Sequence, residues 1–188
     1  MKLLRKILFP FVPLYYVVVS LRNKLYDWSF YKSTSYDFPL ICVGNLSVGG
    51  TGKTPMVEYL VSFLMSKYKV ATLSRGYGRV SKGFVIADLQ STAQDIGDEP
   101  YQLFKKFKDI SVAVDADRQN GLDLLKKSKP SIEVVLLDDA FQHRKVSAGF
   151  NILLTAYDQI YCHDYVLPSG NLREPRSGAK RAEAIVVT

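Results

Sequence analysis

The sequence contains few cysteines. Two are present among 188 residues, Cys42 and Cys162, and they form no Cys-x-x-Cys pair. Neither a zinc knuckle nor a disulfide framework is therefore indicated. Cys42 lies in an apolar run, where cysteine usually serves as a small buried hydrophobic residue. This cysteine usage fits a reducing, cytosolic setting.

A long uninterrupted apolar run is also missing. The most apolar stretch, residues 7–19, falls short of the roughly 20 residues that a spanning helix needs. Pro10 and Pro13 lie within it and interrupt helical hydrogen bonding. No small-x-small cleavage site follows, so a cleaved signal peptide is not favoured.

We interpret residues 1–30 as a membrane-interface anchor. Its rings would enter the lipid and its cations would meet anionic headgroups. The alternative is a helix that packs on the rest of the domain. The rings belong to Phe9, Phe11, Tyr15 and Tyr16, and the flanking cations to Lys2, Arg5, Lys6, Arg22 and Lys24.

The charge is unbalanced toward the basic side. The formal net charge is +7, within a composition that is 47% hydrophobic and 23% charged. This composition predicts a folded domain, and the length suits one domain. A positive excess favours acidic partners such as nucleic acid, anionic lipid or phosphate-bearing substrates, and charge alone does not choose among them.

From residue 38 onward, short apolar runs alternate with amphipathic stretches. This alternation predicts an α/β fold with a mostly parallel sheet flanked by helices, whose ligands gather at the carboxyl ends of the strands. We expect one domain over residues 38–188, and a second domain beyond residue 188. The predicted strands are 40–43, 70–73, 111–114, 134–137, 152–154 and 184–188, the helices are 55–67, 100–108 and 117–127, and 81–87 is a small hairpin arm.

A glycine-rich loop follows the first predicted strand and precedes the first predicted helix. Backbone amides and a helix dipole bind phosphate in this context, which predicts a P-loop NTPase-like domain. Lys53 would contact the β- and γ-phosphates, and the Thr54 hydroxyl would ligate magnesium. The alternative is a glycine-rich turn with an incidental lysine. The loop, in which serine replaces the first glycine of the pattern, consists of Ser47, Val48, Gly49, Gly50, Thr51, Gly52, Lys53 and Thr54.

Two acidic residues, Asp138 and Asp139, end the apolar run at 134–137. Carboxylates at the end of a strand beside such a loop hold or orient Mg²⁺ in phosphoryl-transfer enzymes. His143 lies shortly after them, and its position leaves a structural and a catalytic role equally open. Asp98 stands at a predicted helix start, where an amino-terminal cap and a general base are both open.

Two basic loops complete the candidate set. Arg75 and Arg79 lie in a glycine-rich loop after the strand at 70–73, where they could contact phosphate or form an exposed turn. Arg173 lies in a basic loop late in the chain and could touch the nucleotide or the acceptor.

Five motifs together resemble the tetraacyldisaccharide 4'-kinase family. They are VGNLSVGGTGKTP at 43–55, LSRGYG at 73–78, GDEP at 97–100, DDAFQHR at 138–144 and LREP at 172–175. The resemblance covers nearly all of the chain. It implies an enzyme of lipid A biosynthesis that uses ATP and Mg²⁺ to phosphorylate the 4'-hydroxyl of a lipid-linked disaccharide 1-phosphate. It also implies attachment to the cytoplasmic face of the bacterial inner membrane.

The resemblance also implies roles for single residues. Lys53 and Thr54 take the phosphate-loop roles, Asp138 and Asp139 serve the metal, and His143 and Arg173 line the active site. Asp98 matches an aspartate that activates the acceptor hydroxyl together with a histidine of a later domain. We therefore expect nucleotide binding, rather than complete transfer, from these 188 residues. Ala140 stands where glycine is usual.

Three other classes of protein remain open. A P-loop GTPase would carry an Asn-Lys-x-Asp motif, which is missing from these residues. A nucleotide-gated membrane adaptor would bind nucleotide without transferring phosphate. A nucleic-acid-binding ATPase is the least favoured, and we expect no nucleic-acid partner.

Overall fold

The computed structural model describes residue 5 and residues 8–188. Its centre is a seven-stranded sheet in the order β3-β4-β2-β5-β1-β6-β7. All neighbouring strands run parallel except β3, which pairs antiparallel with β4. The strands are β1 Leu40–Asn45, β2 Val70–Ser74, β3 Val85–Ile86, β4 Ser111–Val114, β5 Val134–Asp138, β6 Phe150–Thr155 and β7 Ala184–Val187.

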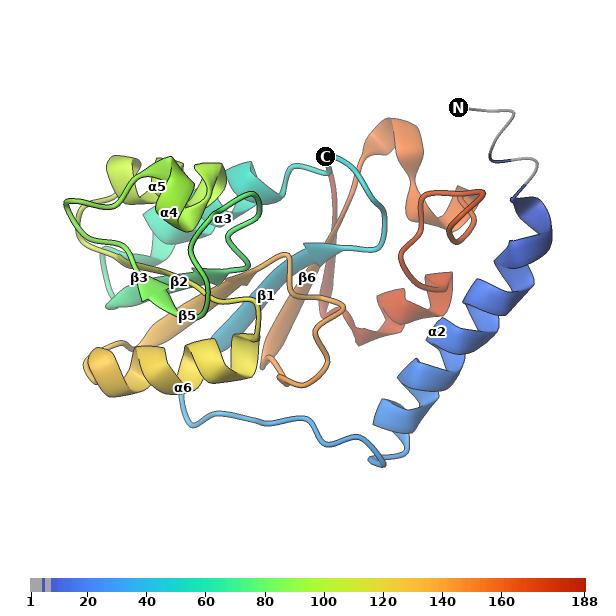
Figure 1. The fold of residues 1–188 in the computed structure, drawn as a ribbon, viewed down its shortest axis with the longest axis horizontal. Helices are drawn as coiled ribbons and strands as arrows, with labels where there is room; N and C mark the ends of the chain where they lie inside the picture. The colour runs from blue at the N-terminus through green and yellow to red at the C-terminus, as the bar shows by residue number, and fades with distance from the viewer. Residues whose placement is uncertain (1–4, 6–7) are drawn as a thin grey trace.

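Helices cover both faces of this sheet (Figure 1). On one face, Leu122 and Leu125 of α6 join the larger buried core. On the other, Val57 and Val61 of α3 join Leu103 of α5 in a second core. The helices are α2 Val12–Asp27, α3 Lys53–Leu64, α4 Ala93–Ile96, α5 Asp98–Lys106 and α6 Arg118–Ser128, with 3-10 turns η1 Phe9–Phe11, η2 Tyr157–Gln159, η3 Tyr161–His163 and η4 Arg176–Arg181.

The predicted α/β fold with a mostly parallel, helix-covered sheet is confirmed, and six of its strands lie where apolar runs predicted them. These runs are continuous because a strand covered on both faces needs apolar side chains on both. The hairpin arm at 81–87 is wrong. Only β3 forms there, and it pairs with β4 instead of folding back on itself. The preceding loop is held by Arg79, whose guanidinium donates to the Gly83 carbonyl.

The helix α2 stands at the edge of the molecule, beside the segment that joins β6 to β7 (Figure 1). Pro13 does not break it, because it lies in the first turn, where no helical partner for its nitrogen is needed. Among the described residues, no helix is both long enough and apolar enough to span a bilayer. Lys2 and Lys6 of the expected anchor lie outside the described residues.

One side of α2 faces solvent with large apolar groups, and the other side contacts the domain. The expectation that Tyr15 enters lipid is wrong, because its hydroxyl donates to the Arg173 carbonyl at 2.8 Å. Burial, and the charge of Glu174, raise the pKa of Tyr15. The outward groups of α2 are Leu14, Tyr16, Val17, Val18 and Leu21, and Phe9 and Phe11 of the preceding turn η1 are exposed as well.

Candidate active site

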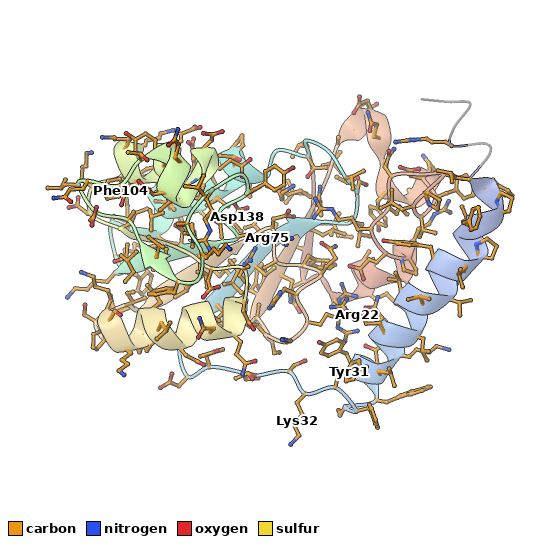
Figure 2. All side chains as sticks on the ribbon, in the orientation of Figure 1. Arg22, Tyr31, Lys32, Arg75, Phe104 and Asp138 are labelled. Carbon is orange, nitrogen blue, oxygen red and sulfur yellow. The ribbon has the colours of Figure 1, made fainter. Side chains whose placement is uncertain are left out.

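A cleft of about 680 Å³ opens at the carboxyl ends of the central strands. Figure 2 shows Asp138 and Arg75 facing this region between the sheet and the helices above it. Seven residues singled out in the sequence line this one cleft, although they come from five separate segments. They are Lys53, Arg75, Asp98, Asp138, Asp139, His143 and Arg173.

The glycine-rich loop connects β1 to α3 and has a backbone that suits a phosphate. Gly49 and Gly52 have φ of 118° and 72°, values that favour glycine. A Cβ added at Gly49 or Gly50 would meet nothing within 4 Å, so the backbone there faces open space. This exposed backbone at the amino end of a helix fits an anion such as a triphosphate.

The rest of the loop is fixed to the domain. The Val48 amide donates to the Asn171 carbonyl at 2.8 Å. Ser47, the off-pattern position, is buried and forms a bridge with Leu172. Thr51 is also buried, whereas Thr54 is half-buried in the first turn of α3 and does not line the cleft.

The carboxylate of Asp139 lies close to two cationic side chains. Its carboxylate lies 3.7 Å from Lys53 Nζ and 3.0 Å from Arg173 Nη1. Its φ of 48° is unusual for a residue other than glycine, and such conformations cluster at functional sites. The arrangement places two cations and one carboxylate together at the end of the glycine-rich loop.

Asp138 is buried at the end of β5 with a different environment. Its Oδ1 has no hydrogen-bond partner within the described part of the chain. Its pKa is raised to about 7, first by burial and then by the nearby charges of Glu99 and Asp139, while Lys53 and Arg118 oppose the shift. A cation bound beside it would offset these effects and favour the carboxylate.

Asp98 does not cap its helix, so that structural alternative is wrong. Gly97 occupies the N-cap of α5, and Asp98 lies exposed in the first turn. Gly97 also lets α5 approach its neighbour closely, because a Cβ there would lie 2.9 Å from the Tyr77 carbonyl oxygen. The Asp98 carboxylate is therefore free of a capping role and available to the cleft.

His143 is half-buried beside the cleft. Its Nε2 lies 3.8 Å from Asp117 Oδ1, too far for a hydrogen bond. Burial lowers its pKa and the positive charge of Arg118 lowers it further, so the neutral imidazole is favoured at neutral pH.

No sequence pattern predicted a role for Arg118. This residue is only 3% exposed, and it donates from Nη1 to the Asp115 carbonyl and from Nη2 to the Asp138 carbonyl. It therefore ties the ends of β4 and β5 together beneath the cleft. Its place in the first turn of α6 gave no sign of this, because its partners are backbone atoms. Of the arginines at 75 and 79, Arg75 lines the cleft and Arg79 bonds its own loop.

The described residues include no group of three or more His, Cys, Asp or Glu side chains arranged to hold a metal ion. Mg²⁺ does not require such a group, since it keeps several waters and binds through one or two carboxylates plus substrate phosphates. The free oxygen of Asp138 beside the phosphate loop fits a Mg²⁺ ion that arrives with a nucleotide.

Comparisons with known proteins give one result. A family model described as tetraacyldisaccharide-1-P 4'-kinase matches residues 4–188. A tetraacyldisaccharide 4'-kinase from Flavobacterium johnsoniae is 61% identical over 188 residues, which are 100% of this chain and 55% of that protein. The one from Bacteroides thetaiotaomicron is 55% identical over 98% of this chain and 49% of its own length.

A solved structure has a similar fold. The crystal structure of LpxK from Aquifex aeolicus in complex with ATP matches with a TM-score of 0.90 and 46% identity. The match covers 98% of this chain and 59% of that one. The present chain therefore spans about half the length of the curated relatives it matches.

Proposed function

Since this chain belongs to the tetraacyldisaccharide-1-P 4'-kinase family, we propose that the protein transfers the γ-phosphate of ATP to the 4'-hydroxyl of a tetraacyldisaccharide 1-phosphate. This reaction belongs to lipid A biosynthesis. The observation that carries the proposal is the single cleft in which a glycine-rich loop, two cations and two carboxylates meet.

The cations and the loop would bind the triphosphate. Lys53 and Arg173 both contact Asp139, so a nucleotide's phosphates would compete with or join that carboxylate. Phosphoryl transfer depends mainly on positioning and on charge neutralisation, which these groups supply. Thr54, Asp138 and Asp139 would hold Mg²⁺, which supplies further neutralisation of phosphate charge.

Asp98 and His143 would serve the acceptor side of the cleft. Asp98 is exposed at the start of α5, where its carboxylate can accept the proton of a hydroxyl or orient the group that does. His143 is favoured in its neutral form, which can donate or accept a hydrogen bond at the cleft wall.

The acceptor is an amphiphile, and α2 supports a membrane site of action. Its outward apolar groups would insert into the interface, and the basic excess would favour an anionic surface. We place the protein at the cytoplasmic face of the bacterial inner membrane, where ATP is available. Residues 1–30 are the proposed anchor and residues 38–188 the proposed kinase domain.

A kinase assay on the protein at its natural length tests this function. With ATP, Mg²⁺ and a tetraacyldisaccharide 1-phosphate, we expect transfer of one phosphate to the 4' position. Lys53→Ala should lower turnover by a factor on the order of a thousand, because removing a donor to transition-state charge costs roughly 3–4 kcal/mol. Asp98→Ala should also reduce turnover severely.

Lys67→Ala is the matched control, since Lys67 is exposed just beyond α3 and does not line the cleft. It should leave turnover unchanged. Full activity of Lys53→Ala would contradict the proposed mechanism. Preference for GTP would favour a GTPase, and ATP binding without a phosphorylated product would favour an adaptor.

A further inference from the structure

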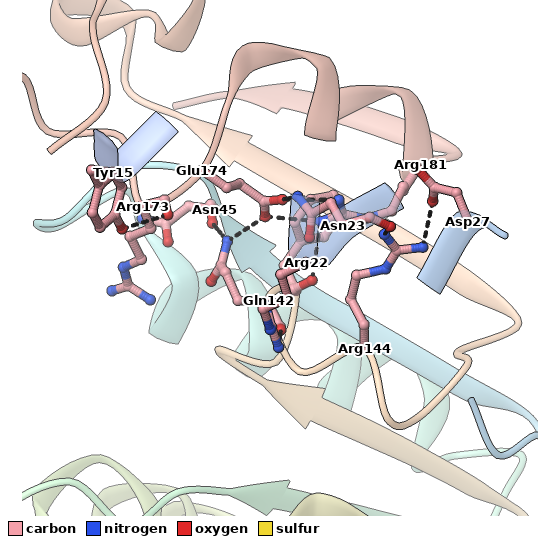
Figure 3. Close-up of polar contacts among 11 residues, drawn as sticks. Tyr15, Arg22, Asn23, Asp27, Asn45, Gln142, Arg144, Arg173, Glu174 and Arg181 are labelled. Carbon is pink, nitrogen blue, oxygen red and sulfur yellow. Dashed lines mark hydrogen bonds and ion pairs between the residues drawn. The ribbon is translucent and has the colours of Figure 1, made fainter. Parts of the chain in front are cut away.

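A buried carboxylate, Glu174, is fixed by four hydrogen bonds from three directions (Figure 3). Arg181 donates two of them, at 2.9 and 2.8 Å. Asn23 Nδ2 donates a third at 2.9 Å, and Gln142 Nε2 a fourth at 3.0 Å. Glu174 is 2% exposed, and a Cβ at Gly178 would lie 2.8 Å from its Oε2. The side chain therefore has one position.

Direct hydrogen bonds lead from this carboxylate to the phosphate loop. Gln142 Nε2 also donates to the Asn45 carbonyl at 2.8 Å, and Asn45 Nδ2 donates to Thr51 Oγ1 at 2.8 Å. Asn45 and Thr51 are 0% and 6% exposed, so water cannot readily replace these bonds. Gln142 also lines the cleft.

The same carboxylate is bonded to α2, the helix with the outward apolar side. Besides the Asn23 contact, Arg22 of α2 donates to the Gln142 carbonyl at 3.1 Å, and Tyr15 donates to the Arg173 carbonyl. These contacts all reach the two segments that carry Gln142 and Arg173. The segments that hold α2 against the domain therefore also form the wall of the cleft.

We propose that Glu174 is a positioning residue that couples the seating of α2 to the geometry of the phosphate loop. This inference rests on the proposed function, because the geometry of the phosphate loop affects activity through the nucleotide that the loop binds. Glu174 lies behind the cleft wall and acts through Gln142 and Asn45. When Asn23 is removed, a buried carboxylate loses one donor, and the change passes to Gln142, which holds the loop.

The test is the affinity for Mg²⁺ and a non-hydrolysable ATP analogue, measured by calorimetry on the natural-length protein without acceptor. Glu174→Gln should raise the Kd about tenfold, because hydrogen bonds to a charged group are worth roughly that factor or more. Asn23→Ala should raise it about threefold, the effect of one neutral donor. Asp27→Asn is the matched control. It removes the charge of a carboxylate on α2 that lies 2.7 Å from Arg144 Nη2 and does not contact Glu174, and it should leave the Kd unchanged.

Near-ultraviolet circular dichroism checks that each variant is folded at the temperature of measurement. In the kinase assay, the KM for ATP should rise in Glu174→Gln while the KM for the disaccharide stays the same, which a general loss of stability would not produce. An unchanged Kd in both Glu174→Gln and Asn23→Ala overturns the proposal. So does an effect of Asp27→Asn equal to that of Asn23→Ala. If the wild type binds the analogue but makes no phosphorylated disaccharide, the proposed function fails, and the Kd comparison still decides the role of Glu174.

Discussion

Asp138 is a carboxyl group whose ionisation the fold opposes. Its pKa of about 7 stands above the ordinary 3.8 that an unfolded chain gives it. Below pH 4 both states hold the proton, and stability is unaffected. As the pH rises toward 7, the unfolded state releases the proton while the folded state keeps it, so the folded state loses stability. Above pH 7 the loss is complete.

Asp138→Asn should therefore stabilise the isolated protein at pH 8 by on the order of a few kcal/mol, and should have no effect near pH 4. Urea denaturation at the two pH values measures this. Asp139→Asn is the control, because its carboxylate is paired with Lys53 and Arg173 and its loss should give no such gain. Equal stability of Asp138→Asn and wild type at pH 8 would contradict the pKa assignment.

Some single residues could be predicted from sequence and others could not. Lys53, Asp138 and Asp139 lie in short motifs next to a strand, so their common edge followed from the parallel fold, and the structure brings them to one cleft. Their roles stay predictions. Arg118 was missed because its partners are backbone carbonyls, and Glu174 because most of its partners are distant in sequence. The Asn23–Glu174 bond, for instance, spans 151 positions, and no local pattern marks it.

At the scale of elements, the phosphate loop combines two glycines with different requirements. Gly49→Ala should destabilise the folded protein by about 1 kcal/mol, because alanine is strained at a φ of 118°. Gly50→Ala is the matched control. Its φ is not positive and its surroundings are open, so its free energy of unfolding should not fall.

Urea denaturation without nucleotide measures both changes, and ATP binding should weaken in both if the backbone there approaches phosphate. A loss of stability in Gly50→Ala as large as in Gly49→Ala would refute the conformational argument.

The helices and strands also show what sequence patterns predict best. Continuous apolar runs predicted the positions of the buried strands, since those strands have apolar surroundings on both faces. The orientation of α2 was harder to predict, because apolar side chains project from much of its circumference. Its hydrogen bonds to Arg173, Glu174 and Gln142 show which side faces the domain, and these bonds depend on the tertiary fold.

At the scale of the whole molecule, the proposed membrane attachment depends on the outward side of α2. Leu14, Val18 and Leu21 are more than half exposed, and replacing all three with serine should reduce binding to anionic lipid vesicles about tenfold or more. Vesicle flotation measures it. Tyr15→Phe is the control, because it changes only the side that faces the domain. Undiminished flotation of the triple variant would contradict the anchor.

The position of β1 in the interior of the sheet, between β5 and β6, has a consequence for the order of folding. Leu40 pairs with Val135 and Ile41 with Phe150, so both neighbours of β1 are synthesised long after it. Pairings so distant in sequence close large loops and form slowly. On the ribosome, the glycine-rich loop emerges early but gains its two flanking strands only after β6 has been made. Nucleotide affinity would therefore appear late in folding and report its completion.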